Sequence, residues 1–436
     1  MAAFLLVSLL AGATGGCGST APAVAGPPAP SREAFAFRDP RDGAPPPPLA
    51  SRDTKVLEAA VAAVRRGDAA GAEKALAGRK GKGADAPPPL RLAAVYVAMA
   101  RGDRDGARTA LGELTAACST WVAAVEAEAD LALAEGRAPA ALERYRTLVR
   151  LAPSDRRAAA RVESLRTEVA ADKRAEAEAA LRDGDLDAAR RAANSLLQLE
   201  PASPAAYVYL SQAAAAGGKT DDAWAWAKEA RQKAPTDPAV AAFAAEAASR
   251  ARRFNDAAIL YEGLAAADPA FVPKAEEARL EFRVQNLPEA ARRAAESPRL
   301  TRAQLAALLQ GTVPEFRDAL VPPGAEIAVD VVDRADRATL VRAIGLSFLS
   351  VSAETHRVGA ESAVGKDELA AALRRVAVPT GRGRTPKGCL APEAPTAAGL
   401  ATCGILSETP SRNVTGREAL RALEKAARIG REGGTR

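Results

Sequence analysis

The sequence predicts an all-α protein built mostly of repeated helix pairs, and three observations support this class. Hydrophobic residues make up 48% of the 436 residues, yet only 4% are aromatic, and alanine, the best helix former, supplies much of the rest. The β-branched and aromatic residues that strands favour are scarce. A turn signal also recurs between helical patterns at a nearly constant interval. Because the length exceeds one typical core, we expect more than one domain.

The first 17 residues are predicted to be an export signal. Phe4–Gly12 is an apolar run that is too short to span a bilayer but has the length of a signal-peptide core. Small residues lead from this run directly to Cys17. The arrangement resembles a bacterial lipobox, which implies a lipid on Cys17 and an exported lipoprotein anchored to a membrane, on the periplasmic or outer-membrane side. An ordinary cleaved signal peptide is the alternative.

Residues 18–52 are predicted to be a disordered linker. Prolines cluster over Ala21–Pro48 and end in an uninterrupted run of four. Proline-rich chain stays extended at about 3.1 Å per residue and acts as a semi-rigid spacer. We therefore expect this linker to hold the folded part of the chain away from a membrane surface.

Residues 53–299 are predicted to be an array of helical repeats. The turn signal recurs at intervals of 35, 34, 48, 34, 34 and 34 residues, and prolines that end helices keep the same interval. The turn signals are Gly67, Gly102, Gly136, Gly184, Gly218, Arg252 and Asn286, and the prolines are Pro153, Pro201, Pro235 and Pro269. The single long interval has helical spacing without Gly or Pro, so we expect one long helix near 154–183.

A 34-residue period of helix, turn and helix resembles the tetratricopeptide repeat (TPR) family. Ala223, Ala227 and Ala230 fall on the packing positions of one second helix, and Pro235 ends that unit. Small residues at these positions let the neighbouring helix approach closely. The resemblance implies an α-α superhelical solenoid with an extended concave surface that binds proteins or peptides.

Three aromatic residues of the array are candidate protein-binding residues. Tyr209, Trp224 and Trp226 do not all fit core positions, and exposed aromatic side chains suit peptide recognition. The alternative is that they pack against adjacent repeats or linkers.

Residues 300–436 are predicted to form a small, mostly helical C-terminal region, because the 34-residue interval stops there. Three similar helix starts follow instead, at Leu300–Ala306, Val364–Ala370 and Val414–Leu420. The first and third have capping-box spacing, in which a Thr hydroxyl and a Gln or Glu side chain satisfy the first amides of a helix. Plain helix capping therefore explains these starts without a ligand.

The order of elements in this region resembles the S-layer homology domain. Val329–Val331 supplies an Asp-Val opening, Ala335–Leu346 reads as a helix closing on Gly-Leu, and the Thr-Arg-Ala-Gln start at Thr301 is close to the motif of that family. The resemblance implies binding of anionic cell-wall polysaccharide, for which a cationic side chain at a helix start is suited. The implied glycan-binding candidates are Arg302, Lys366 and Arg417.

Cysteine usage offers one disulfide candidate. Cys389 and Cys403 lie 14 residues apart in the C-terminal region, where a bridge in an exported protein would stabilise a loop-rich segment. Cys118 lies in an alanine-rich helical pattern and is predicted to be a buried thiol.

The composition argues against catalysis, cofactors and nucleic-acid binding. His356 is the one histidine of the chain, and no glycine-rich phosphate loop is found, so we predict no catalytic site, no metal site and no cofactor. The net charge of +6 comes from alternating signs, as on a solvated helical surface, rather than from a basic stripe.

These observations favour a non-enzymatic, lipid-anchored scaffold of the bacterial cell envelope that binds other envelope proteins or peptides through its repeats. The alternative is a protein that binds cell-wall polysaccharide through the C-terminal region and uses the repeats as a spacer. An enzyme with an acid/base pair of carboxylates is a third hypothesis, because carboxylates are plentiful.

Overall fold

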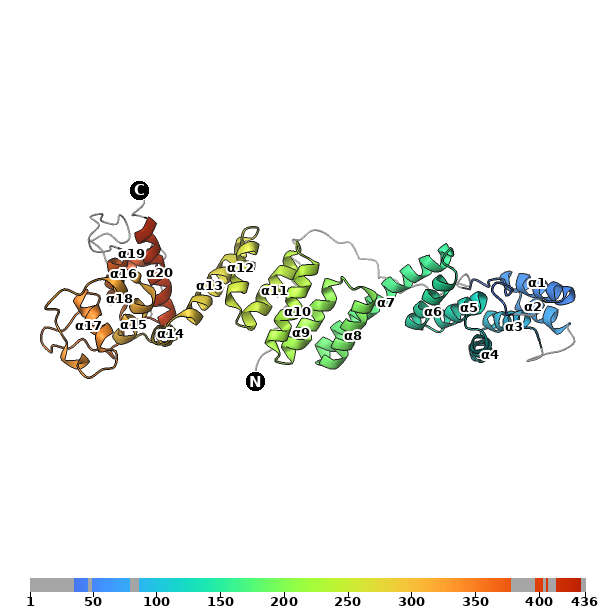
Figure 1. Ribbon diagram of the computed structural model, residues 1–436, viewed down its shortest axis with the longest axis horizontal. Helices are drawn as coiled ribbons and strands as arrows, with labels where there is room; N and C mark the ends of the chain where they lie inside the picture. Colours follow the sequence, from blue (N-terminus) through green and yellow to red (C-terminus); the bar gives the residue numbers. More distant parts are fainter. Residues whose placement is uncertain are drawn as a thin grey trace, which may run out of the picture. The chain divides into compact units, whose positions relative to one another are not determined.

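The computed structural model describes residues 35–45, 49–78, 86–377, 397–402, 405–406 and 413–432. In these ranges the regular structure is helical and the only β-type pairing is two isolated backbone bridges, so the predicted all-α class is confirmed (Figure 1).

The helices of the array follow one another as short-linked pairs. They are α1 (Ser51–Arg65), α2 (Ala69–Ala77), α3 (Pro88–Arg101), α4 (Arg104–Ala117), α5 (Val122–Ala134), α6 (Ala138–Leu151), α7 (Arg156–Asp183), α8 (Leu186–Leu199), α9 (Pro204–Ala216), α10 (Thr220–Lys233), α11 (Pro238–Arg250), α12 (Phe254–Ala265), the 3₁₀ turn η3 (Pro269–Phe271), α13 (Val272–Asn286) and α14 (Glu289–Ala295). The long helix α7 lies where the 48-residue interval predicts one. No helix in the described ranges is long and apolar enough to cross a membrane.

The chain forms two compact units. Unit 1 comprises Met1–Glu176 together with Gln198–Glu200, and unit 2 comprises Ala177–Leu197 together with Pro201–Arg436. Helix α7 contributes residues to both. Unit 1 holds the pairs from α1 to α6, and unit 2 holds the later pairs and the C-terminal region.

Six of the seven periodic turn signals end the first helix of a pair with a left-handed residue, Asn286 being the exception. Five glycines take this conformation, with φ between +73° and +80°, and Arg252 takes it with φ of +56°. The glycines are Gly67, Gly102, Gly136, Gly184 and Gly218. An aspartate after three of them caps the next helix, as where Asp68 Oδ1 accepts from the amide of Gly71 at 2.7 Å. The turn signal found in the sequence is therefore a helix stop followed by a helix start.

A column of buried alanines lets successive helices pack. One alanine lies five residues after each turn signal, in the second helix of each pair, and each is at most 3% exposed. They are Ala72, Ala107, Ala141, Ala189, Ala223, Ala257 and Ala291. No larger side chain separates the helices at these points, so neighbouring helices approach closely. Successive helices from α9 to α12 therefore lie side by side, as Figure 1 shows. The predicted TPR-like repeat array is confirmed.

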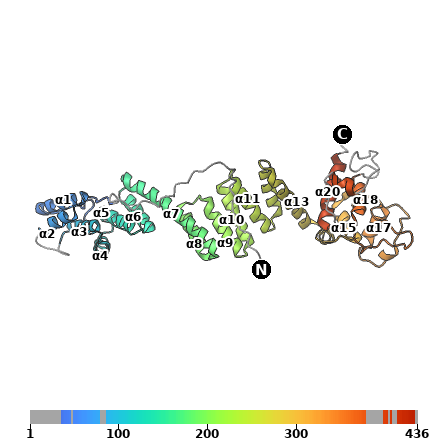
Figure 2. The same ribbon diagram turned by 180° about the vertical axis from the view of Figure 1, so that it is seen from behind.

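The C-terminal region of unit 2 is built around three helices and shares its core with α13 and α14. Its elements are α15 (Arg302–Thr312), α16 (Pro314–Asp318), the 3₁₀ turn η4 (Val329–Val331), α17 (Arg337–Gly345), α18 (Lys366–Ala377), α19 (Ala397–Thr402) and α20 (Gly416–Glu432). Leu300, Val364 and Val414, the first residue of each predicted helix start, are all fully buried in this core. α15 and α18 each pack against α20, and Figure 2 shows the three helices grouped in the same way from behind.

Backbone pairing joins the three helix starts at one junction. The amide of Leu300 donates to the carbonyl of Val414 at 2.8 Å, and the amide of Val364 donates to the carbonyl of Leu300 at 2.9 Å. The predicted capping box at Thr301 and Gln304 is present, with both of its hydrogen bonds formed. The three similar motifs thus share a structural role, which is to begin three helices beside one another.

Candidate functional site

A stretch of unit 1 without helix or strand, which turns at Pro40–Gly43, lies across the first helices of three successive pairs. Residues 35–45, here called the N-terminal segment, contact α1, α3, α5 and the start of α7; we call that face of the helices the segment groove. The disordered linker predicted over 18–52 is therefore wrong for these residues. Composition alone does not predict this docking, because it depends on two phenylalanines and an arginine among the prolines that contact side chains of the repeats.

At the start of the segment, repeat side chains bind the main chain. The amide of Ala36 donates to Asp130 Oδ2 on α5 at 2.8 Å. The carbonyl of Phe37 accepts from the guanidinium of Arg65, at the end of α1, at 2.7 Å and 3.1 Å. These bonds satisfy an extended backbone that has no helix or strand partner of its own.

The same pattern continues along the segment. The hydroxyl of Tyr96 on α3 donates to the carbonyl of Arg38 at 2.9 Å. The indole N–H of Trp121, before α5, donates to the carbonyl of Pro40 at 3.2 Å. Both aromatic side chains are buried, so each polar tip needs a partner, and the segment supplies it.

Aromatic packing fixes the side chains of the segment. The ring centroids of Phe35 and Phe37 lie 5.4 Å apart, and Phe37 meets Tyr96 edge to face at 5.3 Å. Both phenylalanines pack against the core of α3, α4 and α5. Phe37 has a φ of +39°, an uncommon conformation for a large side chain, which costs about 1 kcal/mol.

Arg38 fills an acidic seat in the groove. Its guanidinium forms ion pairs with Glu126 on α5 and with Asp155, which also caps the start of α7. The side chains of Glu126 and Asp155 are only 4% and 13% exposed. Burial alone would raise the pKa of Asp155, but the amide of Ala158 and the Arg38 guanidinium hold it below its usual range. Charges this deep need a partner, and Arg38 is that partner.

Asp130 adds a third carboxylate beside this seat, one helical turn after Glu126. It is 2% exposed and accepts hydrogen bonds from the Tyr145 hydroxyl and the Ala36 amide. Burial raises its pKa to about 6, although both hydrogen bonds act in the opposite direction. Burial therefore disfavours the ionised carboxylate, whereas the hydrogen-bond donors around it partly stabilise that form.

We expect Asp130→Asn to change how stability depends on pH. Between the ordinary carboxyl pKa of 3.8 and about 6, the folded chain binds a proton that the unfolded chain does not. The contribution of Asp130 to the unfolding free energy therefore falls as the pH rises through this window, by about 3 kcal/mol, and is constant above it. Urea unfolding of both chains at pH 4.5 and 7.5 measures this.

Asparagine resembles the protonated acid, with one acceptor oxygen and one donor. The variant is therefore expected to be about as stable as the natural chain at pH 4.5 and more stable than it at pH 7.5, where only the natural chain has lost the stability linked to the protonated carboxyl. Other titrating groups are common to both chains and cancel in the difference. A difference that does not change with pH would contradict the raised pKa.

The aromatic candidates of unit 2 occupy three different environments. Tyr209 is 9% exposed and donates its hydroxyl to Glu178 Oε1 at 2.6 Å, so it belongs to the core. Trp224 is half-buried against α11 and α12. Trp226 is 37% exposed and lies 6.1 Å from the Tyr207 ring. Of the three, Trp226 has the most exposed side chain.

The cationic candidates of the C-terminal region contact protein groups. Arg302 donates through Nε to Glu368 at 2.6 Å and through a terminal nitrogen to the carbonyl of Val358, also at 2.6 Å. Arg417 forms ion pairs with Glu277 and Glu281 of α13. Lys366 begins α18, and it too interacts with other groups. Arg302 and Arg417 therefore hold elements of unit 2 together.

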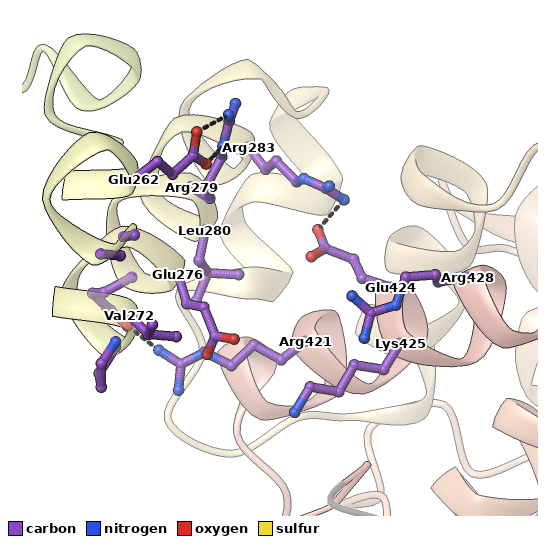
Figure 3. Close-up of a pocket in the computed structure, with 14 residues that line it drawn as sticks. Glu262, Val272, Glu276, Arg279, Leu280, Arg283, Arg421, Glu424, Lys425 and Arg428 are labelled. Carbon is purple, nitrogen blue, oxygen red and sulfur yellow. Dashed lines mark hydrogen bonds and ion pairs between the residues drawn. The ribbon is translucent and has the colours of Figure 1, made fainter. Parts of the chain in front are cut away.

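A hollow of about 850 Å³ lies between α12, α13 and α20 in unit 2 (Figure 3). Arg283 points at Glu424 across it, with 2.7 Å between the charged atoms, and Arg279 pairs with Glu262. Burial raises the pKa of Glu424. The charges that line the hollow are largely neutralised by one another, which does not suit a strongly charged ligand.

The remaining predicted residues carry no site in the described ranges. His356 is exposed and lies 3.5 Å from Glu326. Among described residues no three histidine, cysteine or acidic side chains are grouped to hold a metal. Cys118 is a half-buried free thiol. The lipidation candidate Cys17 and the disulfide candidates Cys389 and Cys403 lie outside the described residues and stay predictions.

Sequence reasoning missed the segment groove, although two signals for it are present. Glu126 and Asp130 lie four residues apart in the most apolar stretch of the array, where one buried helical face must carry both carboxylates. Phe35, Phe37 and Arg38 interrupt a proline-rich stretch that is otherwise poor in large side chains. Each signal indicates groups that need a buried partner. The carboxylates of α5 and the large side chains of the N-terminal segment are partners of one another.

Solved structures similar to this chain are repeat proteins. A TPR protein from Parabacteroides merdae is 16% identical, with 49% of this chain and 79% of that one covered and a TM-score of 0.21. The TPR2AB domain of yeast Sti1, solved with pHSP90, is 14% identical, with 53% and 96% covered and a TM-score of 0.26. A TPR protein from Thermus thermophilus is 17% identical, with 52% and 99% covered and a TM-score of 0.20. No protein-family model and no curated protein matches.

Proposed function

We propose that this chain is a non-catalytic scaffold that binds extended segments of other proteins on the first helices of its repeats. One observation carries the proposal: a segment without helix or strand already lies in the groove of unit 1. Repeat side chains hold it through its main chain, at Ala36, Phe37, Arg38 and Pro40. A surface that binds backbone groups in this way suits peptide ligands in general, because every peptide carries them.

The described residues also offer little to support the enzyme hypothesis. The buried carboxylates Glu126 and Asp130 are paired with Arg38, Tyr145 and the main chain rather than facing an open cavity. An acid/base pair has to reach a substrate within hydrogen-bond distance. A binding surface needs only the contacts that are present.

Site-specific photo-crosslinking in cells tests this function. A photoreactive amino acid at Arg65 on α1, or at Tyr207 on α9, is expected to capture partner proteins, because both positions lie on first helices. The matched control is Glu113, exposed on the second helix α4. Mass spectrometry should map the captured sites to extended partner segments. Equal capture at Glu113, or no protein capture at any position, would refute the proposal.

We place this scaffold at the bacterial cell envelope, anchored by a lipid on Cys17. The support is the apolar run Phe4–Gly12 and the small residues before Cys17. Metabolic labelling with a fatty acid is expected to mark the chain, and Cys17→Ser should abolish both the label and the membrane association. Labelling that survives this substitution would contradict the anchor.

Binding of cell-wall polysaccharide by the C-terminal region is the second candidate. The junction of three similar helix starts favours it, whereas the pairing of Arg302 and Arg417 with carboxylates leaves few cationic groups for a glycan. Retention of the purified chain on wall polymer tests it. Retention that is lost in Arg302→Ala/Arg417→Ala, with folding intact by circular dichroism, would favour this role over a purely structural one.

A further inference from the structure

We infer that the N-terminal segment is a built-in ligand, and that the segment groove binds in its place a partner segment with two aromatic residues in alternation followed by an arginine. This inference rests on the proposed function, because it names the chemistry of the partner and the way in which the same groove is closed. Some contacts of the groove would form with any peptide, whereas others select a side chain.

The main-chain contacts do not select a sequence. The donors of Tyr96, Trp121 and Arg65 reach carbonyl oxygens, and Asp130 reaches an amide. Any extended peptide without a proline at the Ala36 position offers the same groups. These contacts set the direction and register of a bound segment.

Arginine selection comes from the acidic seat. Glu126 and Asp155 bind the Arg38 guanidinium from two sides, and Asp130 lies one turn further along α5. With the segment in place the side chains of Glu126 and Asp155 are only 4% and 13% exposed, so a bound segment that covers them has to supply a counter-charge. A guanidinium can contact two carboxylates at once, whereas an ammonium is a compact point charge, so arginine is preferred over lysine.

Aromatic selection comes from the neighbouring apolar surface. Phe37 contacts the Tyr96 ring, and Phe35 contacts Phe37, so the two rings form a continuous cover over α3. The ring centroids of residues 35 and 37 lie 5.4 Å apart, so aromatic residues at these two positions cover the surface together. Smaller residues at these positions would expose the buried face beneath them.

Tethering explains how the groove is closed. Only five residues separate the segment, which ends at residue 45, from Ser51 at the start of α1. A ligand on so short a link has an effective concentration of about 1 mM, so a segment with an intrinsic Kd of about 10 μM would make a competing partner bind about 100-fold more weakly. The left-handed conformation of Phe37 works against the internal ligand, which favours exchange.

Peptide binding to the full chain tests the inference. The probe is a fluorescent peptide with the sequence of residues 34–43, measured by anisotropy against the natural chain and against an open variant, Phe37→Ala/Arg38→Ala. We expect the open variant to bind the peptide at least about 30-fold more tightly, because its own segment no longer competes. A peptide with alanine in place of Arg38 is expected to bind about tenfold more weakly.

Two controls keep this result specific. Arg41→Ala changes another arginine of the same segment, which is exposed and pairs with Asp39 and Glu58, and it should leave the groove closed. Glu126→Gln in the open variant should weaken binding of the arginine peptide but not of the alanine peptide.

A second design avoids unfolding of the open variant. A protease site replacing Pro46–Pro48 keeps every described contact of the segment, and cleavage turns the segment into a separate ligand. Added peptide should then displace the cleaved segment, as seen by gel filtration. The inference would be overturned if the peptide neither bound a folded open variant nor displaced the cleaved segment. Equal binding of the arginine and alanine peptides would also overturn it. Partner capture at Tyr207 in unit 2 would still support the proposed function, so the two failures are distinguishable.

Discussion

Trp121→Ala is expected to destabilise unit 1 by about 3–5 kcal/mol, the usual cost of removing a fully buried tryptophan. Trp121 is 0% exposed and is among the largest buried side chains of the chain. Its loss opens a cavity between α3, α4 and α5 and also removes the hydrogen bond to the carbonyl of Pro40. Urea unfolding followed by circular dichroism should therefore show an earlier transition for unit 1, and the N-terminal segment should become sensitive to protease.

Trp226→Ala is the matched control for this substitution. The side chain is 37% exposed on α10 and contacts mainly Tyr207, so its removal is expected to cost about 1 kcal/mol or less. A chain that loses equal stability in both variants would contradict the position of Trp121 beneath the segment. The comparison is useful because the two substitutions are chemically identical.

Gly416→Ala is expected to destabilise the C-terminal region by about 3 kcal/mol or more, because the new methyl group has no room. A Cβ at Gly416 would lie 1.9 Å from the carbonyl oxygen of Ala294 and 2.7 Å from that of Ala295. Both are backbone atoms of the α14 end, which cannot rotate away as a flexible side chain would. Helix α20 would have to move, and the ion pairs of Arg417 with Glu277 and Glu281 would weaken with it.

Gly365→Ala is the control at the corresponding start of α18. A Cβ there meets no atom within 4 Å, so the change is expected to alter stability by less than about 1 kcal/mol. Thermal unfolding of the two variants separates the cases. Equal stability of Gly416→Ala and the natural chain would show that α20 does not dock on α14 as described.

Local rules carry most of the fold. The interval of 34 residues, the left-handed turns and the alanines five residues after each turn are all readable in the sequence, because each depends on one residue type at one position. The C-terminal junction was only partly predictable. The three similar starts are visible in the sequence, but their meeting depends on backbone bonds between Leu300, Val364 and Val414, which are far apart along the chain.

The segment groove was not predicted, for a physical reason. Proline content favours an extended linker, and it is correct that residues 35–45 form no helix or strand. Whether an extended chain stays solvated or docks depends on a few side chains and on a receptor far away in sequence. Here Arg38 lies 88 residues from Glu126 and 117 from Asp155. No local pattern contains that information.

The position of Phe37 tests the central claim most directly. Photoreactive benzoylphenylalanine in place of Phe37 in the purified full chain, irradiated at low concentration, should crosslink within the same molecule to the peptide of α3 that contains Tyr96. Peptide mapping by mass spectrometry identifies the product. A chain in which residue 37 forms no intramolecular crosslink, or reacts at random over the repeats, would contradict the docked segment.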